Sequence, residues 1–325
     1  MSMVNDPAAE ALLEDVPCLL CRRDDAVTVL YPSTLAGVDG LTLDVAAFRC
    51  TSTGYGDHFQ VVQCQHCGLV YCSPRLKPDV FLRSYEAVAD DRYMAERDAR
   101  VRTFRKHLRT MEKIVGSPAN RRLLDVGAYI GVFVDVARQV GWQAEGIEPS
   151  HWAVGQAQAN GLPVRQGDLT HPDLTPEAYD VVTLWDVVEH FTDPLTELER
   201  AYVLTKPGGW IVIHTIDISS PTARFFGAKW PFLMEMHLVY FSRATQRAML
   251  EAAGYEFVKV HTQGRYLSAG YLANRIGAAF SQRIGNTLES GLRRFGLADW
   301  LVPINTLDLF TMYARKPSVA RQPNP

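Results

Sequence analysis

Residues 123–133, LLDVGAYIGVF, decide the fold because they join an apolar run to an amphipathic pattern through a glycine turn. The run predicts a buried strand with Asp125 at its tip, Gly127 in the turn and Gly131 at the start of a helix. In open α/β sheets such a turn lies at the crevice where the strand order reverses, and ligands bind there. The stretch therefore predicts a ligand site at this strand end.

The sequence that follows repeats the same alternation of short apolar runs and helical patterns. Strands are expected over 122–128, 142–149, 163–169, 179–186 and 210–216. Ser150 is expected to cap one intervening helix, which stops at Gly161, and Asp193-Pro194 to open another, closed at Gly208-Gly209. The pattern predicts an α/β, Rossmann-like doubly wound sheet with a five-strand core.

The last third of the chain is less regular. A long loop is expected over 217–240, a helix from Ser242 to near Gly254, and strands over 256–263 and 307–316. An insertion at about 265–304 separates the two strands and is too long for a hairpin loop. Apolar residues recur in it every four positions, with arginines off that ridge: Leu272, Ile276, Phe280, Ile284, Leu288, Leu292; Arg275, Arg283, Arg293, Arg294. The ridge predicts a helix that packs on its own domain or forms a lid, a dimer face or a membrane-surface helix.

The glycine turn argues against a dinucleotide. A dinucleotide-binding turn needs a middle glycine so that the backbone approaches the pyrophosphate, and here Tyr129 takes that position. A nucleoside cofactor without phosphate avoids this conflict.

Four motifs at consecutive strand ends carry a resemblance to a known family: LLDVGAYIGVF, GIEPS, QGDL and YDVVTLWDVVEHFTDP. In this order they resemble the class I S-adenosylmethionine-dependent methyltransferases, whose sheet has seven strands. The resemblance covers about residues 121–260, and LVPINTLDLFTMYARKP is similar to the family's final strand. It implies the following cofactor contacts: Asp125, Gly127, Gly131 and Asp186 at the methionine end, Glu148 on both ribose hydroxyls, and Asp168 on the adenine amino group.

All six cysteines lie within the first 72 residues, in a chain without an expected export signal. Four of them form two C-x2-C knuckles: Cys18, Cys21, Cys64 and Cys67. Four thiolates saturate a tetrahedral zinc ion, which predicts a structural zinc site with a lobe, 22–63, projecting from it. Cys50 and Cys72 are expected to be packing residues.

The run from the first knuckle to CQHCGLVYCSPR resembles the N-terminal zinc module of sugar and polysaccharide methyltransferases, including nucleotide-sugar C-methyltransferases. That resemblance implies a carbohydrate-type acceptor, methylated on oxygen or carbon in sugar, polysaccharide or natural-product biosynthesis. It also makes Tyr85 and Tyr93 candidate acceptor contacts or, alternatively, interface tyrosines.

Two histidines are candidates for a general base, because histidine titrates near neutral pH. His190 follows the fourth strand, and His237 lies in EMHLVYFS, which resembles the EHxxYFS pattern whose histidine is the base in the sugar C-methyltransferases. Met236 stands where that pattern has glutamate. Asp217 and Tyr240 flank the same loop and are weaker candidates for acceptor contacts.

The formal net charge of −3 argues against a general nucleic-acid partner. The alternatives are an RNA-base methyltransferase, supported by Arg100, Arg102, Arg105, Lys106 and Arg109, or a non-catalytic scaffold. We expect a cytoplasmic enzyme without a membrane span, acting on a small molecule, with a homodimer as an option. The expected organisation is a flexible N-terminus (1–17), a zinc module (18–78), a helical connector (79–120), a methyltransferase domain (121–316) and a flexible tail (317–325).

Overall fold

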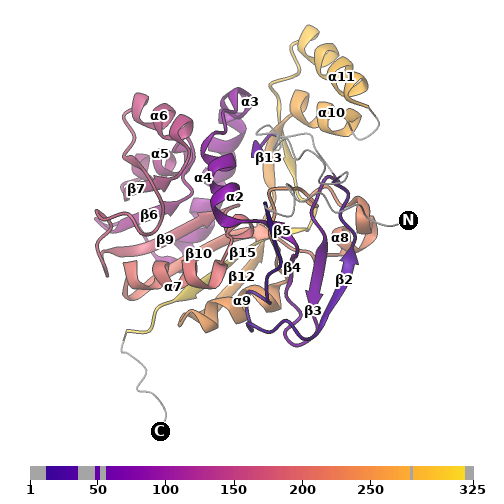
Figure 1. Ribbon diagram of the computed structural model, residues 1–325. Helices are drawn as coiled ribbons and strands as arrows, with labels where there is room; N and C mark the ends of the chain where they lie inside the picture. The colour runs from indigo at the N-terminus through magenta and orange to yellow at the C-terminus, as the bar shows by residue number, and fades with distance from the viewer. Residues whose placement is uncertain (1–11, 36–47, 52–55, 279–280, 319–325) are drawn as a thin grey trace.

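The computed structural model describes residues 12–35, 48–51, 56–278 and 281–318. Its centre is a seven-stranded sheet with the order β12-β15-β10-β9-β6-β7-β8 (Figure 1). The strands are β6 (Arg122–Val126), β7 (Gln143–Glu148), β8 (Val164–Gln166), β9 (Tyr179–Trp185), β10 (Thr205–Ile216), β12 (Glu256–Thr262) and β15 (Leu309–Arg315). Only β15 runs antiparallel to its neighbours within this sheet. The predicted α/β class and the seven-strand sheet are confirmed.

Helices cover both faces of this sheet (Figure 1). On one side lie α4 (Arg97–Val115), α5 (Val132–Gln139) and α6 (His151–Ala159), and on the other α7 (Pro194–Leu204) and α9 (Arg243–Ala252). The predicted N-caps are confirmed, because the side chains of Ser150, Asp193 and Ser242 accept hydrogen bonds from the backbone of the first turns of α6, α7 and α9.

Two expected boundaries are wrong. Helix α7 ends at Leu204, before Gly208-Gly209, because Thr205 already pairs with Tyr179 of β9 and Pro207 cannot continue a helix. The expected loop at 217–240 contains α8 (Pro221–Phe226), η3 (Gly227–Lys229) and β11 (Val239–Tyr240).

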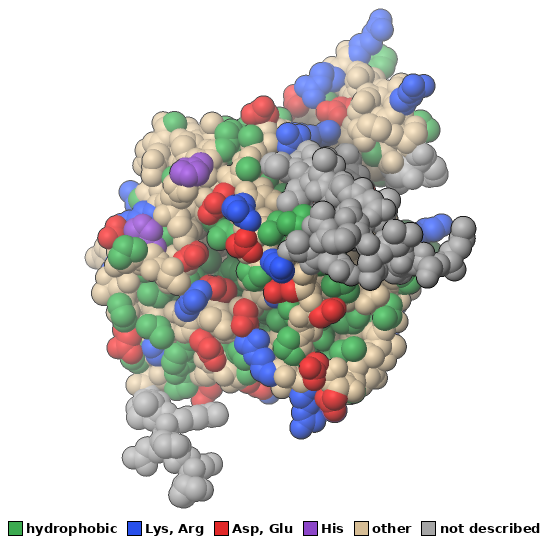
Figure 2. All heavy atoms as spheres, in the orientation of Figure 1, with side chains coloured by type: hydrophobic (Ala, Val, Ile, Leu, Met, Phe, Trp, Pro, Cys, Tyr) green, Lys and Arg blue, Asp and Glu red, His purple; other side chains and the backbone are tan. Residues whose placement is uncertain are grey.

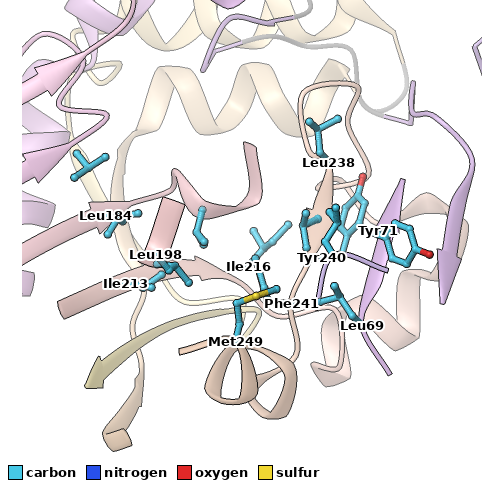
Figure 3. Close-up of a cluster of buried hydrophobic side chains, with 14 of the residues drawn as sticks. Leu69, Tyr71, Leu184, Leu198, Ile213, Ile216, Leu238, Tyr240, Phe241 and Met249 are labelled. Atoms are coloured by element: carbon cyan, nitrogen blue, oxygen red, sulfur yellow. The ribbon is translucent and has the colours of Figure 1, made fainter. Parts of the chain in front are cut away.

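The N-terminal region forms a second, four-stranded sheet, β11-β4-β3-β2. Its own strands are β2 (Val27–Tyr31), β3 (Val61–Cys64) and β4 (Val70–Cys72), and β11 of the larger domain completes it at the β4 edge. Figure 3 shows the side chains of Leu69 and Tyr71 beside Tyr240 and Phe241, within one hydrophobic cluster. The two regions therefore share a core.

The expected flexible N-terminus is partly ordered, because β1 (Leu13–Glu14) pairs with β5 (Arg75–Leu76). Residues 1–11 and 319–325 lie outside the described residues. The segment after β5 carries α2 (Pro78–Glu86) and α3 (Asp91–Ala95), which lead into α4.

The insertion forms two helices rather than one ridge. β13 (Arg265–Ser268) and β14 (Leu301–Ile304) pair antiparallel and carry α10 (Ala269–Ala278) and α11 (Gln282–Arg294) between them. Ser281 caps α11 by accepting from the backbone N–H of Ile284, so the expected ridge is interrupted there. Phe280 lies outside the described residues.

Candidate active site

The turn after β6 passes through three residues with left-handed backbone, Gly127, Tyr129 and Gly131, at φ 66°, 49° and 76°. A Cβ on Gly127 would lie 2.6 Å from Cγ2 of Val187, and one on Gly131 would lie 2.8 Å from Cδ1 of Leu162. Both positions therefore require glycine, because the left-handed backbone disfavours other residues and because a Cβ would collide with a neighbouring side chain. Tyr129 adopts the same left-handed backbone conformation, which raises the free energy of a non-glycine residue by about 1 kcal/mol.

Aromatic packing holds Tyr129 in that conformation. Its ring meets Tyr93 edge-on at 4.4 Å between centroids, and Trp152 at 5.9 Å. The turn therefore stays tight although Tyr129 stands at the middle-glycine position, and the Tyr129 side chain lies in a small apolar cluster.

Glu148, the last residue of β7, is fully buried at the adjacent strand end. One carboxylate oxygen accepts from the backbone N–H of Tyr129 at 3.0 Å, and the other accepts from that of Ser150 at 2.8 Å. Burial raises the pKa of Glu148 to about 7, although these two N–H groups lower it. Each oxygen retains a second lone-pair site for a ligand hydroxyl.

The other three acidic residues expected at the cofactor lie at neighbouring strand ends and differ in exposure. Asp125 is buried and accepts from the Thr183 hydroxyl at 2.7 Å, and burial raises its pKa to about 8. Asp186 directly follows β9 and is exposed, with an Oδ1 atom 3.9 Å from Nε2 of His214. Asp168 is exposed after β8, and its Oδ1 accepts from the N–H and the hydroxyl of Thr170.

Arg100, on α4, is a site residue that the sequence did not indicate as a cofactor contact. Its guanidinium carbon lies 3.5 Å from the centroid of the Tyr93 ring, and Asp186 is among the charges that act on it. Among the described residues, Nε of Arg100 and the hydroxyl of Tyr129 are buried without a hydrogen-bond partner. Buried unpaired polar atoms at this place fit a polar ligand such as an amino-acid group.

His190 and His237 lie side by side, and the charge of Asp186 acts on His190. Their ring centroids lie 5.0 Å apart, and Tyr85 lies 6.4 Å from the His190 ring. Nδ1 of His190 donates to the carbonyl of Met236, and Nδ1 of His237 donates to that of Phe232, both at 2.7 Å. These carbonyls can only accept, so Nε2 is the basic nitrogen of each neutral ring. The two candidate bases are thus brought together.

Glu189 adds a carboxylate to this pair, since its ligand atom and those of both histidines lie within 4.8 Å of one another. It is buried, it accepts from the Thr215 hydroxyl at 2.9 Å, and burial together with the charge of Asp186 raises its pKa to about 8. Burial lowers the pKa of His190 and lowers that of His237 to about 3. The expectation of a His237 pKa near neutrality therefore needs correction, because the ring is desolvated.

Two weaker candidates are engaged in structural contacts. The carboxylate of Asp217 is buried and accepts from Arg243 at 3.0 Å and from Ser219. Tyr240 is buried in β11, with its hydroxyl 3.5 Å from the carbonyl of Met234. Tyr85 is partly buried, and Tyr93 is buried against Tyr129.

The four knuckle cysteines form one cluster, with all Sγ atoms within 4.8 Å of one another. Sγ of Cys18 lies 3.3 Å from that of Cys67, and Sγ of Cys21 lies 3.5 Å from that of Cys64. Four thiolates around zinc are separated by about 3.8 Å when each Zn–S bond is about 2.3 Å, so the cluster fits the ion.

Both knuckles have the same backbone turn. The N–H of Arg22 donates to the carbonyl of Cys18, and the N–H of Gly68 donates to that of Cys64. Arg22 and Gly68 each follow the second cysteine of a knuckle, and both have positive φ. This repetition supports a shared ligand.

The remaining cysteines differ from each other. Cys72 is buried as expected, and its thiol lies 3.4 Å from the carbonyl of His237. Cys50 is exposed, so its prediction as a packing residue is wrong. Thr51 beside it is tied to Asp90, the N-cap of α3, which holds this part of the lobe at the surface of the connector.

The sequence profile of the family described as "Methyltransferase domain" matches residues 93–260, just over half of the chain. The chain belongs to this methyltransferase family. With the acidic strand ends and the glycine turn described above, the matched region is a methyltransferase domain of the S-adenosylmethionine-dependent type.

Curated relatives of the methyltransferase include ubiquinone biosynthesis O-methyltransferases. The protein of Leptothrix cholodnii is 32% identical over 118 residues, which are 34% of this chain and 50% of the relative. That of Aeromonas salmonicida is 30% identical over 156 residues, 43% of this chain and 64% of the relative. The chain thus spans about half to two thirds of the length of these two relatives.

Solved structures with a similar fold are more distant. A methyltransferase from Archaeoglobus fulgidus is 19% identical, with a TM-score of 0.48 over 70% of this chain and 100% of the other. A phosphoethanolamine N-methyltransferase of Haemonchus contortus is 18% identical, with a TM-score of 0.42 over 65% of this chain and 52% of the other.

Proposed function

We propose that this methyltransferase methylates a hydroxyl group of a small polyhydroxyl acceptor of the carbohydrate type. The observation that carries the proposal is the pair His190 and His237, whose Nδ1 atoms are both held by backbone carbonyls. Two neutral rings with basic Nε2 atoms beside the acidic strand ends suit the removal of a hydroxyl proton.

S-adenosylmethionine, when bound, supplies a methyl group on a positively charged sulfur. We propose that Glu148 accepts hydrogen bonds from its ribose hydroxyls, that Asp168 accepts from the adenine amino group, and that the turn of Gly127 and Gly131 lines the methionine end. Asp125 and Asp186 lie at that end too. The unpartnered Nε atom of Arg100 supports a further role, pairing with the methionine carboxylate.

His237 is the proposed base, with His190 as the second candidate. Burial lowers the pKa of His237 to about 3, so the ring is neutral across the working range and is a weak base in the unliganded protein. His190, 5.0 Å away between centroids, is the neighbouring acceptor.

Oxygen is favoured over carbon as the methylated atom for two reasons. The curated relatives are named O-methyltransferases. In addition, Met236 stands where the C-methyltransferase pattern has glutamate, so that pattern is incomplete here. The carbohydrate character of the acceptor rests on the resemblance of the N-terminal module alone.

The alternative, an RNA acceptor, keeps some support from α4. Arg102, Arg105, Lys106 and Arg109 are exposed and lie on one side of this helix, at spacings of three, four and seven residues. The formal net charge of −3 argues against it, because the whole chain provides little general attraction for a nucleic acid.

The test is a product screen with S-adenosylmethionine carrying a labelled methyl group. Nucleotide sugars, glycans, phenols and RNA are offered separately, and the labelled product is located by mass spectrometry and NMR. An O-methyl sugar supports the proposal, whereas an O-methyl phenol, a C-methyl sugar or methylated RNA would overturn it.

A further inference from the structure

The helical hairpin of α10 and α11 projects from the body of the molecule at the end of β13 and β14 (Figure 1). Its two helices pack through glycine, since a Cβ on Gly277 would lie 2.6 Å from Cα of Gly285. Asn274 and Asn286 join them with a side-chain hydrogen bond of 3.1 Å. The two helices therefore contact each other through small and polar residues.

Two large apolar side chains of α11, and one just past it, remain exposed to solvent. Ile284 is 47% exposed and Leu288 is 45% exposed, and Phe295, just past the helix, is 76% exposed. They are spaced by four and seven residues, which places them on one side of a helix. Ile276 of α10 and Trp300 in front of β14 are also exposed, at 56% and 66%. An apolar face of this kind, left in water, marks an interaction surface.

The hairpin also carries positive charge, but on the side of α11 away from its apolar face, where Arg283 and Arg294 are exposed. Residues 269–294 contain four arginines and one glutamate, although the whole chain has a formal net charge of −3. Figure 2 shows Lys and Arg side chains on the projecting end of the molecule. The basic character is thus local to the hairpin.

The hairpin is attached to the body in a fixed orientation. Arg92 of α3 donates to Glu289 of α11 at 2.9 Å, and its guanidinium lies 5.0 Å from the centroid of the Tyr271 ring. The apolar face therefore belongs to a hairpin that is held in place on the rest of the molecule.

We infer that the α10–α11 hairpin binds the surface of an anionic lipid bilayer, with Ile284, Leu288 and Phe295 between the headgroups and the exposed Arg283 and Arg294 extending from the polar side of α11 to the lipid phosphates. Exposed aliphatic and aromatic residues next to arginines are typical of helices that lie in a membrane interface. Among the described residues no helix is long and apolar enough to cross a membrane. The hairpin would thus lie on the bilayer, whatever the methyl acceptor is.

The experiment is sedimentation of the full-length protein with vesicles. One set contains phosphatidylcholine alone, and the other equal parts of phosphatidylcholine and phosphatidylglycerol. We expect binding to the anionic vesicles that weakens with added salt, and little binding to the neutral ones. Leu288→Glu should weaken binding by about tenfold or more, because it removes apolar burial and adds a negative charge.

The matched control is Val203→Glu, which places the same charge at an exposed apolar position on α7, away from the hairpin. It should bind vesicles as the wild type does. Unchanged affinity of both variants for S-adenosylmethionine shows that they are folded. Equal binding of Leu288→Glu and wild type, or no binding to anionic vesicles, overturns the inference. A wild-type dimer that becomes monomeric in Leu288→Glu would assign the face to a second copy of the chain instead.

Discussion

Arg22 and Asp193 form an ion pair in which the single Nη2 atom of Arg22 donates to both carboxylate oxygens of Asp193, at 2.9 Å and 3.0 Å. Arg22 directly follows the first cysteine knuckle, and Asp193 is the N-cap of α7. The knuckle therefore contacts the segment that carries Glu189 and His190. Because the pair is partly exposed, its own contribution to stability is at most about 1 kcal/mol.

The knuckle cluster leads to the first prediction, on metal content. We expect washed protein to retain about one zinc ion per chain, since four thiolates saturate the ion. Cys64→Ser should lose most of this zinc and unfold at a lower temperature, as measured by elemental analysis and thermal melting. Cys50→Ser is the control, because Cys50 is exposed and outside the cluster. Wild-type protein that lacks zinc after expression with zinc would contradict the assignment.

The second prediction concerns the two histidines. His237→Gln should lower turnover by about 10²- to 10⁴-fold, because a positioned base is lost. Affinity for S-adenosylmethionine should stay within about threefold, since the proposed cofactor contacts come from other strand ends. His190→Gln is measured beside it, and His261→Gln on β12 serves as a control far along the sheet. If His190→Gln abolishes turnover while His237→Gln retains it, His190 rather than His237 is the base.

The third prediction is that Glu148→Ala weakens S-adenosylmethionine binding by about 2–4 kcal/mol, because two hydrogen bonds to a charged acceptor are lost. Calorimetric titration gives the dissociation constant directly. Glu251→Ala, an exposed residue of α9, should bind the cofactor as wild type does. An unchanged dissociation constant in Glu148→Ala would show that the ribose does not bind at the end of β7.

The pH dependence of cofactor binding is the fourth prediction. Burial raises the pKa of Glu148 to about 7, so a falling pH protonates it and removes an acceptor from the ribose hydroxyls. The dissociation constant should rise between about pH 8 and about pH 6, approaching tenfold per unit at the acid end. In Glu148→Gln this dependence should largely vanish. A pH-dependent constant of the same slope in the variant would assign the effect to another group, such as Asp125.

The spatial arrangement of the residues proposed to bind the cofactor was predictable from sequence, because they follow parallel strands of one sheet. Asp125, Gly127, Glu148 and Asp186 are adjacent in space since the ends of those strands meet at one edge. The caps at Ser150, Asp193 and Ser242 were predictable for a similar reason, as each depends on a few neighbouring residues.

Features that depend on long-range packing were not predictable. The pairing of β11 with β4 joins residues far apart in the chain, and no local pattern marks it. The insertion was expected to keep one ridge, but apolar residues spaced by exactly four drift about 40° per step around a helix. The six residues are separated by five such steps, about 200° in all, so they cannot share one face, and the chain starts a new helix after Ser281.

Arg100 shows the same limit at the site itself. In sequence it is one of several cations on α4, and that pattern indicates a solvated helix face. Only the packing of α4 against the turn after β6 turns this one side chain toward Tyr93 and the acidic strand ends.

The fifth prediction tests Arg100 with two ligands that differ in one group. S-adenosylhomocysteine keeps the amino-acid carboxylate, whereas methylthioadenosine lacks the whole amino-acid part. Arg100→Ala should weaken binding of the first by about 1.5–3 kcal/mol, the value of a hydrogen bond to a charged group, and leave the second nearly unchanged. Arg109→Ala, an exposed position on the same helix, is the matched control and should leave both constants unchanged. Arg100→Lys should recover only part of the loss, because lysine keeps the charge but not the planar fork that pairs with a carboxylate. If Arg100→Ala weakens both ligands equally, the arginine supports the Tyr93–Tyr129 packing rather than the carboxylate, and the unpartnered Nε atom belongs to the scaffold of the turn.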